Sequence, residues 1–228
     1  MPISTLTSRN RLILVVLLTL MPWPAVWLGM YGGRSLVLTF ILYHGLCLLP
    51  AVVAGHRLWR GALLVPTRRQ ILHLGIAAAF VLPLTVFVFN WIGSTFISSD
   101  QALAIVTARG FHARWLVPLG VYFTFVNSIL EELFWRGVVL NELQDLPEAH
   151  KRAGALWTAC TFASWHWLVV RLLVRPGWAE LVVAGIVIAG VYFSWLYRRT
   201  GSIVLPILWH ALIFDLPLIL IFAAIVRG

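Results

Sequence analysis

The sequence is poor in charged residues, in lysine and in cysteine. Of its 228 residues, 11% are charged and 61% are hydrophobic, whereas soluble domains carry about 25% charged residues. So few charged side chains cannot cover an apolar core of this size, which excludes a water-soluble globule. The two cysteines, Cys47 and Cys160, both lie within apolar runs, so we expect no disulfide framework.

Acidic residues are scarcer than basic ones, which leaves a formal net charge of +9. The basic residues are scattered between apolar runs and do not gather on one tail, so we expect no nucleic-acid partner. Ten of them lie on one side of the expected spans and six on the other, which predicts a cytoplasmic N-terminus. Lys151 is the only lysine. This composition is typical of GC-rich bacterial genomes, so we expect a bacterial cell (inner) membrane.

Long apolar runs dominate the sequence. A helix needs ~20 residues to cross a hydrocarbon core about 30 Å thick. We therefore expect an all-α, polytopic membrane helix bundle of seven transmembrane helices, with eight as the alternative, in one domain over residues 1–228. The predicted spans are residues 12–31, 35–54, 71–93, 115–140, 153–173, 181–196 and 203–226.

The fourth, fifth and seventh spans contain ionisable residues, although an ionised side chain costs roughly 2.5–3.5 kcal/mol to insert. They are Glu131, Glu132 and Arg136 in the fourth span, His166 in the fifth, and His210 and Asp215 in the seventh. Such residues face the bundle interior or a water-filled cavity, and are functional candidates. Glu132 and Arg136 are four apart with the acid first, so we expect them to pair. Asn127 lies on the polar stripe of Glu131, and for His44, in the second span, we expect a packing role.

Glu131, His166 and His210 lie at a similar depth. At 1.5 Å per residue they are ~16, ~21 and ~16 Å from the same membrane face. Peptide hydrolysis needs a base that activates water, a donor for the oxyanion and an acid for the departing amine. One carboxylate and two imidazoles can supply these groups. The same residues can also form the proton relay of a carrier.

Two motifs in these spans resemble those of a known family. Residues 127–137, NSILEELFWRG, are similar to the EExxxR motif of the CPBP family, which groups CAAX prenyl endopeptidases with bacteriocin-processing and self-immunity proteins. Phe162 and His166 match its FxxxH motif. The resemblance covers a catalytic core at about residues 115–226. It implies an intramembrane endopeptidase in which Glu131 and His166 activate water and His210 binds the oxyanion.

The third family motif, a histidine followed four residues later by Asn or Asp, is only half met. Phe214 stands at that position after His210, and Asp215 is one residue further. On a regular α-helix Asp215 points about 140° away from His210, since each residue turns ~100°. A π-bulge before Pro217 would bring it to the face of His210.

We therefore predict an endopeptidase that cuts within a membrane-embedded cavity. Its partners are membrane lipids and a peptide or protein substrate that is lipidated or carries a leader or a C-terminal signal. The alternatives are a catalytically silent self-immunity or scaffold protein of the same fold, or a proton-coupled carrier. No cofactor is expected, and the alternative is Zn²⁺ held by Glu131, His166 and His210. The predicted supporting residues are Glu132, Arg136, Phe162, Asn127 and Asp215.

Overall fold

The structure, a computed structural model, describes residues 8–144 and 148–227, and every regular element in these ranges is a helix. Six uninterrupted helical runs are long and apolar enough to cross a membrane. They are Arg9–Gly32, Leu36–Ala54, Arg68–Phe96, Ala113–Gln144, Ala179–Thr200 and Val204–Arg227. The predicted all-α membrane bundle is confirmed, and six of its seven predicted spans appear as uninterrupted helical runs. Both cysteines are free, as expected.

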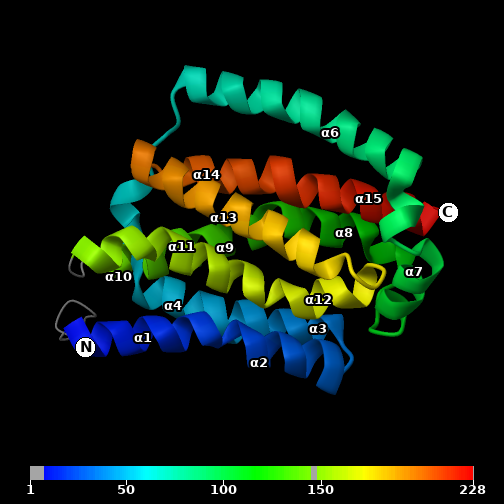
Figure 1. Cartoon of the computed structure of the whole chain (residues 1–228), viewed down its shortest axis with the longest axis horizontal. Coiled ribbons are helices and arrows are strands. Elements are labelled where there is room, and N and C mark those ends of the chain that lie inside the picture. The colour runs from blue at the N-terminus through cyan, green and yellow to red at the C-terminus, as the bar shows by residue number, and fades with distance from the viewer. Residues whose placement is uncertain (1–7, 145–147, 228) are drawn as a thin grey trace.

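The predicted fifth span, residues 153–173, is formed by two helices. Helix α11 (Glu148–Ser164) ends at Ser164, and α12 (His166–Leu173) begins at His166, so Trp165 alone separates them. The two follow one another across the bundle (Figure 1). The number of seven transmembrane helices is therefore not confirmed, because this run is interrupted. The interruption places His166 at the first position of a new helix.

Most of the other runs are chains of short α-helical and π-helical segments. The first two runs hold α1 (Ser8–Leu20), α2 (Pro22–Trp27) and η2 (Leu28–Gly32), then α3 (Leu36–Phe40), η3 (Ile41–Leu48) and α4 (Leu49–Ala54). The fourth holds η5 (Ala113–Trp115), α8 (Leu116–Val121), η6 (Tyr122–Asn127), α9 (Ser128–Glu132), η7 (Leu133–Leu140) and α10 (Asn141–Gln144). The last holds α14 (Val204–Trp209), η8 (His210–Asp215) and α15 (Leu216–Arg227). Helix α13 is Ala179–Thr200, and the connections contain α5 (His56–Trp59), η4 (Arg60–Ala62) and α7 (Ser99–Thr107).

The segments η2, η3, η6, η7 and η8 are π-helical. A π-helix bonds residue i to i+5 and so changes which side chains share a helix face. Segment η8 is the π-helical turn before Pro217 that would bring Asp215 beside His210.

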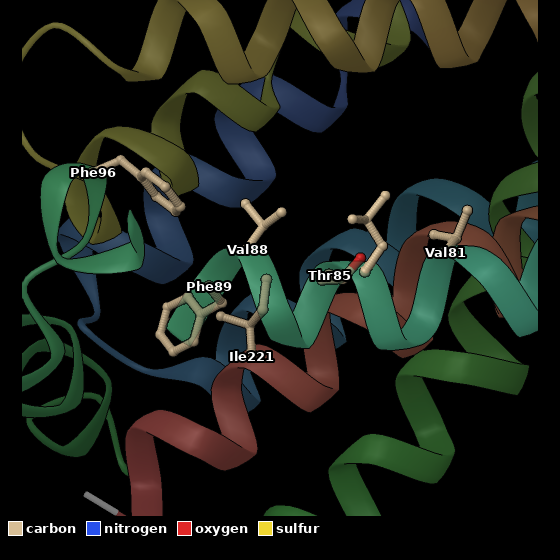
Figure 2. A pocket seen from close by; sticks show the side chains of 7 residues that line it. Val81, Thr85, Val88, Phe89, Phe96 and Ile221 are labelled. Atoms are coloured by element: carbon tan, nitrogen blue, oxygen red, sulfur yellow. The ribbon is translucent and has the colours of Figure 1, made fainter. Parts of the chain in front are cut away.

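The core lies around η7, whose side chains are all buried. Trp135, Phe134 and Phe193 are among its largest fully buried side chains. Helix α6 (Arg68–Phe96) lies at the outside of the bundle (Figure 1) and buries only Leu74 and Gly93 among its residues. An apolar pocket of about 260 Å³ lies between α6 and α15 (Figure 2). No predicted site residue lines it, so the pocket is separate from the buried acidic residues.

Candidate active site

The two glutamates of α9 are buried and have different partners. Glu131 is 2% exposed and Glu132 is fully buried. Oε1 of Glu131 accepts a hydrogen bond from the hydroxyl of Tyr43 at 2.7 Å. Oε1 of Glu132 accepts one from Nη1 of Arg136 at 2.7 Å, which is the pairing expected from their spacing.

Arg136 is held from several sides. Its Nη2 donates to the backbone oxygen of Gly190 on α13 at 3.0 Å. Its guanidinium carbon lies 5.0 Å from the ring centre of Phe162 and 5.2 Å from that of Phe193. A cation between aromatic faces is stabilised by their quadrupoles. The predicted supporting residue Phe162 therefore packs directly against the ion pair.

His210 connects the glutamates to the last helical run. Its Nδ1 lies 2.9 Å from Oε1 of Glu132. Because a carboxylate paired with arginine only accepts hydrogen bonds, this Nδ1 carries a proton. Nε2 faces the site, 3.6 Å from Oε2 of Glu131 and 3.5 Å from Oδ1 of Asp215.

The π-helical segment η8 explains the position of Asp215. Its Oδ2 accepts from the hydroxyl of Ser128 at 2.6 Å and from Nδ2 of Asn127 at 3.2 Å. Phe214 instead packs edge-on against Phe193, with ring centres 5.1 Å apart, and is 37% exposed. Residue 215 rather than residue 214 therefore faces the site.

His166 lies in the same aromatic cluster. Its Nδ1 is 2.8 Å from the backbone oxygen of Phe162. A carbonyl oxygen only accepts, so Nδ1 carries the proton and Nε2 is left as a base. The ring of Phe162 contacts His166 at 4.9 Å and His210 at 6.0 Å. Glu131, His210 and Asp215 thus lie next to one another, whereas His166 joins them through an aromatic ring.

Two residues of the second run were not assigned to the site from the sequence. Tyr43 was not singled out, although its hydroxyl binds Glu131. His44, for which packing was expected, forms hydrogen bonds to Asn127 and Tyr122 at 2.9 and 2.8 Å. The sequence signal that could have indicated them is a tyrosine directly before a histidine in the middle of an apolar span.

The cluster holds more acids than cations. Within the described residues, the cations that Glu131, Glu132 and Asp215 face are Arg136 and, when protonated, His210. Three carboxylates against two cations leave one negative charge. One further proton would neutralise the cluster, so it is suited to accept and release a proton. Oε2 of Glu131 is buried without a hydrogen-bond partner among the described residues. Oε2 of Glu132 is likewise without a partner there, but Oε2 of Glu131 is the one that lies 3.6 Å from Nε2 of His210.

The zinc alternative involves Glu131, His166 and His210. Nδ1 of His210 is bound to Glu132, and its Nε2 faces Glu131 and Asp215. Within residues 8–144 and 148–227, no three His, Cys, Asp or Glu side chains are placed to hold a metal ion.

The chain resembles one protein family. The model of the family described as type II CAAX prenyl endopeptidase Rce1-like matches residues 113–214. This range contains Glu131, His166 and His210. The match confirms the resemblance to CPBP-type intramembrane proteases. Asp215 lies one residue beyond it. No curated protein and no solved structure matches the chain.

The close packing of α11 against α13 predicts a cost for a larger residue at Gly190. A Cβ there would lie 3.0 Å from Ala159 and 3.4 Å from Nη2 of Arg136. Gly190→Leu should lower the free energy of unfolding by about 1–3 kcal/mol, measured by thermal unfolding in detergent. Gly185→Leu on the same helix is the control, because a Cβ there meets nothing within 4 Å. Equal stability of both variants would contradict this packing.

Proposed function

We propose that this protein is a CAAX-type intramembrane endopeptidase that hydrolyses a peptide bond with a water activated by Glu131. The family match over residues 113–214 supports a CAAX-type protease, and the six apolar helical runs support an integral membrane protein. The observation that carries the mechanism is the buried approach of Oε2 of Glu131 to Nε2 of His210, at 3.6 Å. It puts an acceptor for a water proton next to a donor for an oxyanion.

In the first step, Oε2 of Glu131 takes a proton from water while the water oxygen adds to the scissile carbonyl carbon. The carbonyl oxygen becomes an oxyanion, which accepts a hydrogen bond from protonated Nε2 of His210. Nε2 of His166 accepts the second hydrogen of the water and orients it. The carbon–nitrogen bond then breaks, and Glu131 returns its proton to the departing amine. The products are a carboxylic acid and an amine.

Asp215 acts through His210. Its Oδ1 lies 3.5 Å from Nε2 of His210, so it balances the imidazolium charge and orients the ring. Glu132 holds the other nitrogen of the same ring at 2.9 Å. We infer a reaction without metal, since Glu132 is committed to Arg136 and His210.

The proposed substrate is a peptide with a lipidated C-terminus, the class that the family description names. We place the protein in a bacterial inner membrane with its N-terminus in the cytoplasm. Glu131 and His210 then lie ~16 Å below the cytoplasmic surface. The scissile bond must enter the bilayer to meet them, which suits a substrate anchored by a hydrocarbon chain.

Glu131→Gln should abolish cleavage, because an amide cannot take the water proton. We expect a loss of about 10²–10⁴-fold in kcat with unchanged thermal stability. The measurement uses protein reconstituted in liposomes and a prenylated CAAX peptide, with the released tripeptide detected by mass spectrometry. Glu180→Gln, on an acid that lies outside the cluster, is the control.

Other outcomes of this experiment identify the alternatives. A wild-type protein that binds the peptide without cutting it supports a silent immunity or scaffold protein. Proton-driven flux that Glu131→Gln removes, without cleavage, supports a carrier. Stoichiometric zinc in the active protein, with activity lost on chelation, would contradict the metal-free mechanism.

The π-helical register of η8 predicts which of two neighbouring residues matters. Asp215→Ala should lower kcat by about 10²–10³-fold, the usual effect of disrupting one oxyanion donor. Adding Phe214→Asn to it should restore nothing, because residue 214 packs against Phe193. Phe214→Leu alone should keep most of the wild-type kcat, because a leucine still covers the rings of Phe193 and His210 that Phe214 contacts. Recovery of kcat in the double variant would show that this segment is α-helical.

A further inference from the structure

We infer that Tyr43 and His44, adjacent residues of η3, are positioning residues that each hold one of the two carboxylates beside Nε2 of His210. The inference rests on the proposed function. It gives the second helical run a part in the reaction. The sequence motifs, which lie in the fourth to seventh spans, do not include this run. This run lies outside the family match, which begins at residue 113.

Tyr43 holds Glu131. The Tyr43 side chain is 3% exposed, and its hydroxyl donates to Oε1 of Glu131 at 2.7 Å. Its ring is fixed by Trp165, with ring centres 4.5 Å apart. A carboxylate held at Oε1 cannot rotate freely, so Oε2 stays directed at His210. The hydroxyl thus decides which oxygen of Glu131 is free to receive a proton.

His44 holds Asp215 through Asn127. Nδ2 of Asn127 donates to Oδ2 of Asp215 at 3.2 Å, so the amide oxygen is the atom that faces His44. Nε2 of His44 lies 2.9 Å from this oxygen and therefore carries the proton. Nδ1 of His44 then accepts from the hydroxyl of Tyr122 at 2.8 Å. Each nitrogen and oxygen atom of this relay therefore acts either as a donor or as an acceptor.

The relay fixes Asp215 in the same way as Tyr43 fixes Glu131. Ser128 and Asn127 both bind Oδ2 of Asp215, and Oδ1 faces Nε2 of His210 at 3.5 Å. In each carboxylate, one oxygen is bound by the supporting residues and the other points at the imidazole. This is the arrangement that holds a reacting group in one orientation.

The π-helix of η3 allows two consecutive residues to serve one site. Neighbouring side chains diverge strongly on an α-helix, but a π-helix has more residues per turn and a smaller angle between neighbours. Tyr43 and His44 are both buried, at 3% and 5% exposure. Their rings pack together with centres 4.9 Å apart.

The test compares single-group removals in the liposome cleavage assay. Tyr43→Phe removes one hydroxyl and keeps the ring, and Tyr122→Phe removes the outer donor of the relay. His44→Leu breaks the relay, whereas His44→Gln keeps a donor toward Asn127. Tyr197→Phe is the control: Tyr197 is buried, and its hydroxyl is bonded to Asn141, away from the cluster.

We expect Tyr43→Phe and His44→Leu to lower kcat about 10- to 100-fold, the effect of losing a hydrogen bond that supports a charged group. KM should stay within about twofold, because neither residue is placed to touch the peptide. His44→Gln should recover most of the kcat lost in His44→Leu, and Tyr122→Phe should show a smaller decrease. Tyr197→Phe should keep wild-type kcat.

The outcomes separate the two proposals. If the wild type cleaves and Glu131→Gln does not, while Tyr43→Phe and His44→Leu retain wild-type kcat, the positioning inference is wrong and the proposed function stands. The inference is also wrong if kcat falls only in proportion to folded protein, or equally in Tyr197→Phe. A wild-type protein that does not cleave overturns both proposals.

Discussion

The structure depends on the neutralisation of buried charge by the pairing of Glu132 with Arg136. Both side chains are fully buried, and removing one partner of such a pair typically costs about 3–5 kcal/mol. The pair also organises its surroundings, because Arg136 binds Gly190 of α13 and Glu132 binds His210 of η8. Three helical runs therefore meet at this ion pair. Glu131, one residue earlier, is left without an arginine and has the chemistry of a base.

π-helical turns bring the remaining groups to this pair. Asp215 reaches His210 through η8, and Tyr43 and His44 both reach the cluster through η3. π-bulges frequently occur at functional sites. In η8, this register places Asp215 within hydrogen-bond distance of Ser128, at 2.6 Å.

Features of the site that depend on spacing within one helix were predictable from the sequence. Features that depend on contacts with another helical run were not. The Glu132–Arg136 pair follows from i,i+4 spacing, and the six apolar runs follow from hydropathy. The placement of Asp215 was open, because the sequence does not distinguish an α-helical from a π-helical turn before Pro217. The interruption at Trp165 and the bond from Tyr43 to Glu131 depend on contacts between distant segments. No helical periodicity encodes such contacts.

The central claim is that Glu131 acts on water and does not itself attack the substrate. A single turnover of the prenylated peptide in H₂¹⁸O, with protein never exposed to ¹⁸O beforehand, tests this directly by mass spectrometry. Activated water predicts one ¹⁸O atom in the new carboxylate of the product in the first turnover. A product whose new oxygen is ¹⁶O would mean that a carboxylate oxygen of the protein formed the bond, which would contradict the account.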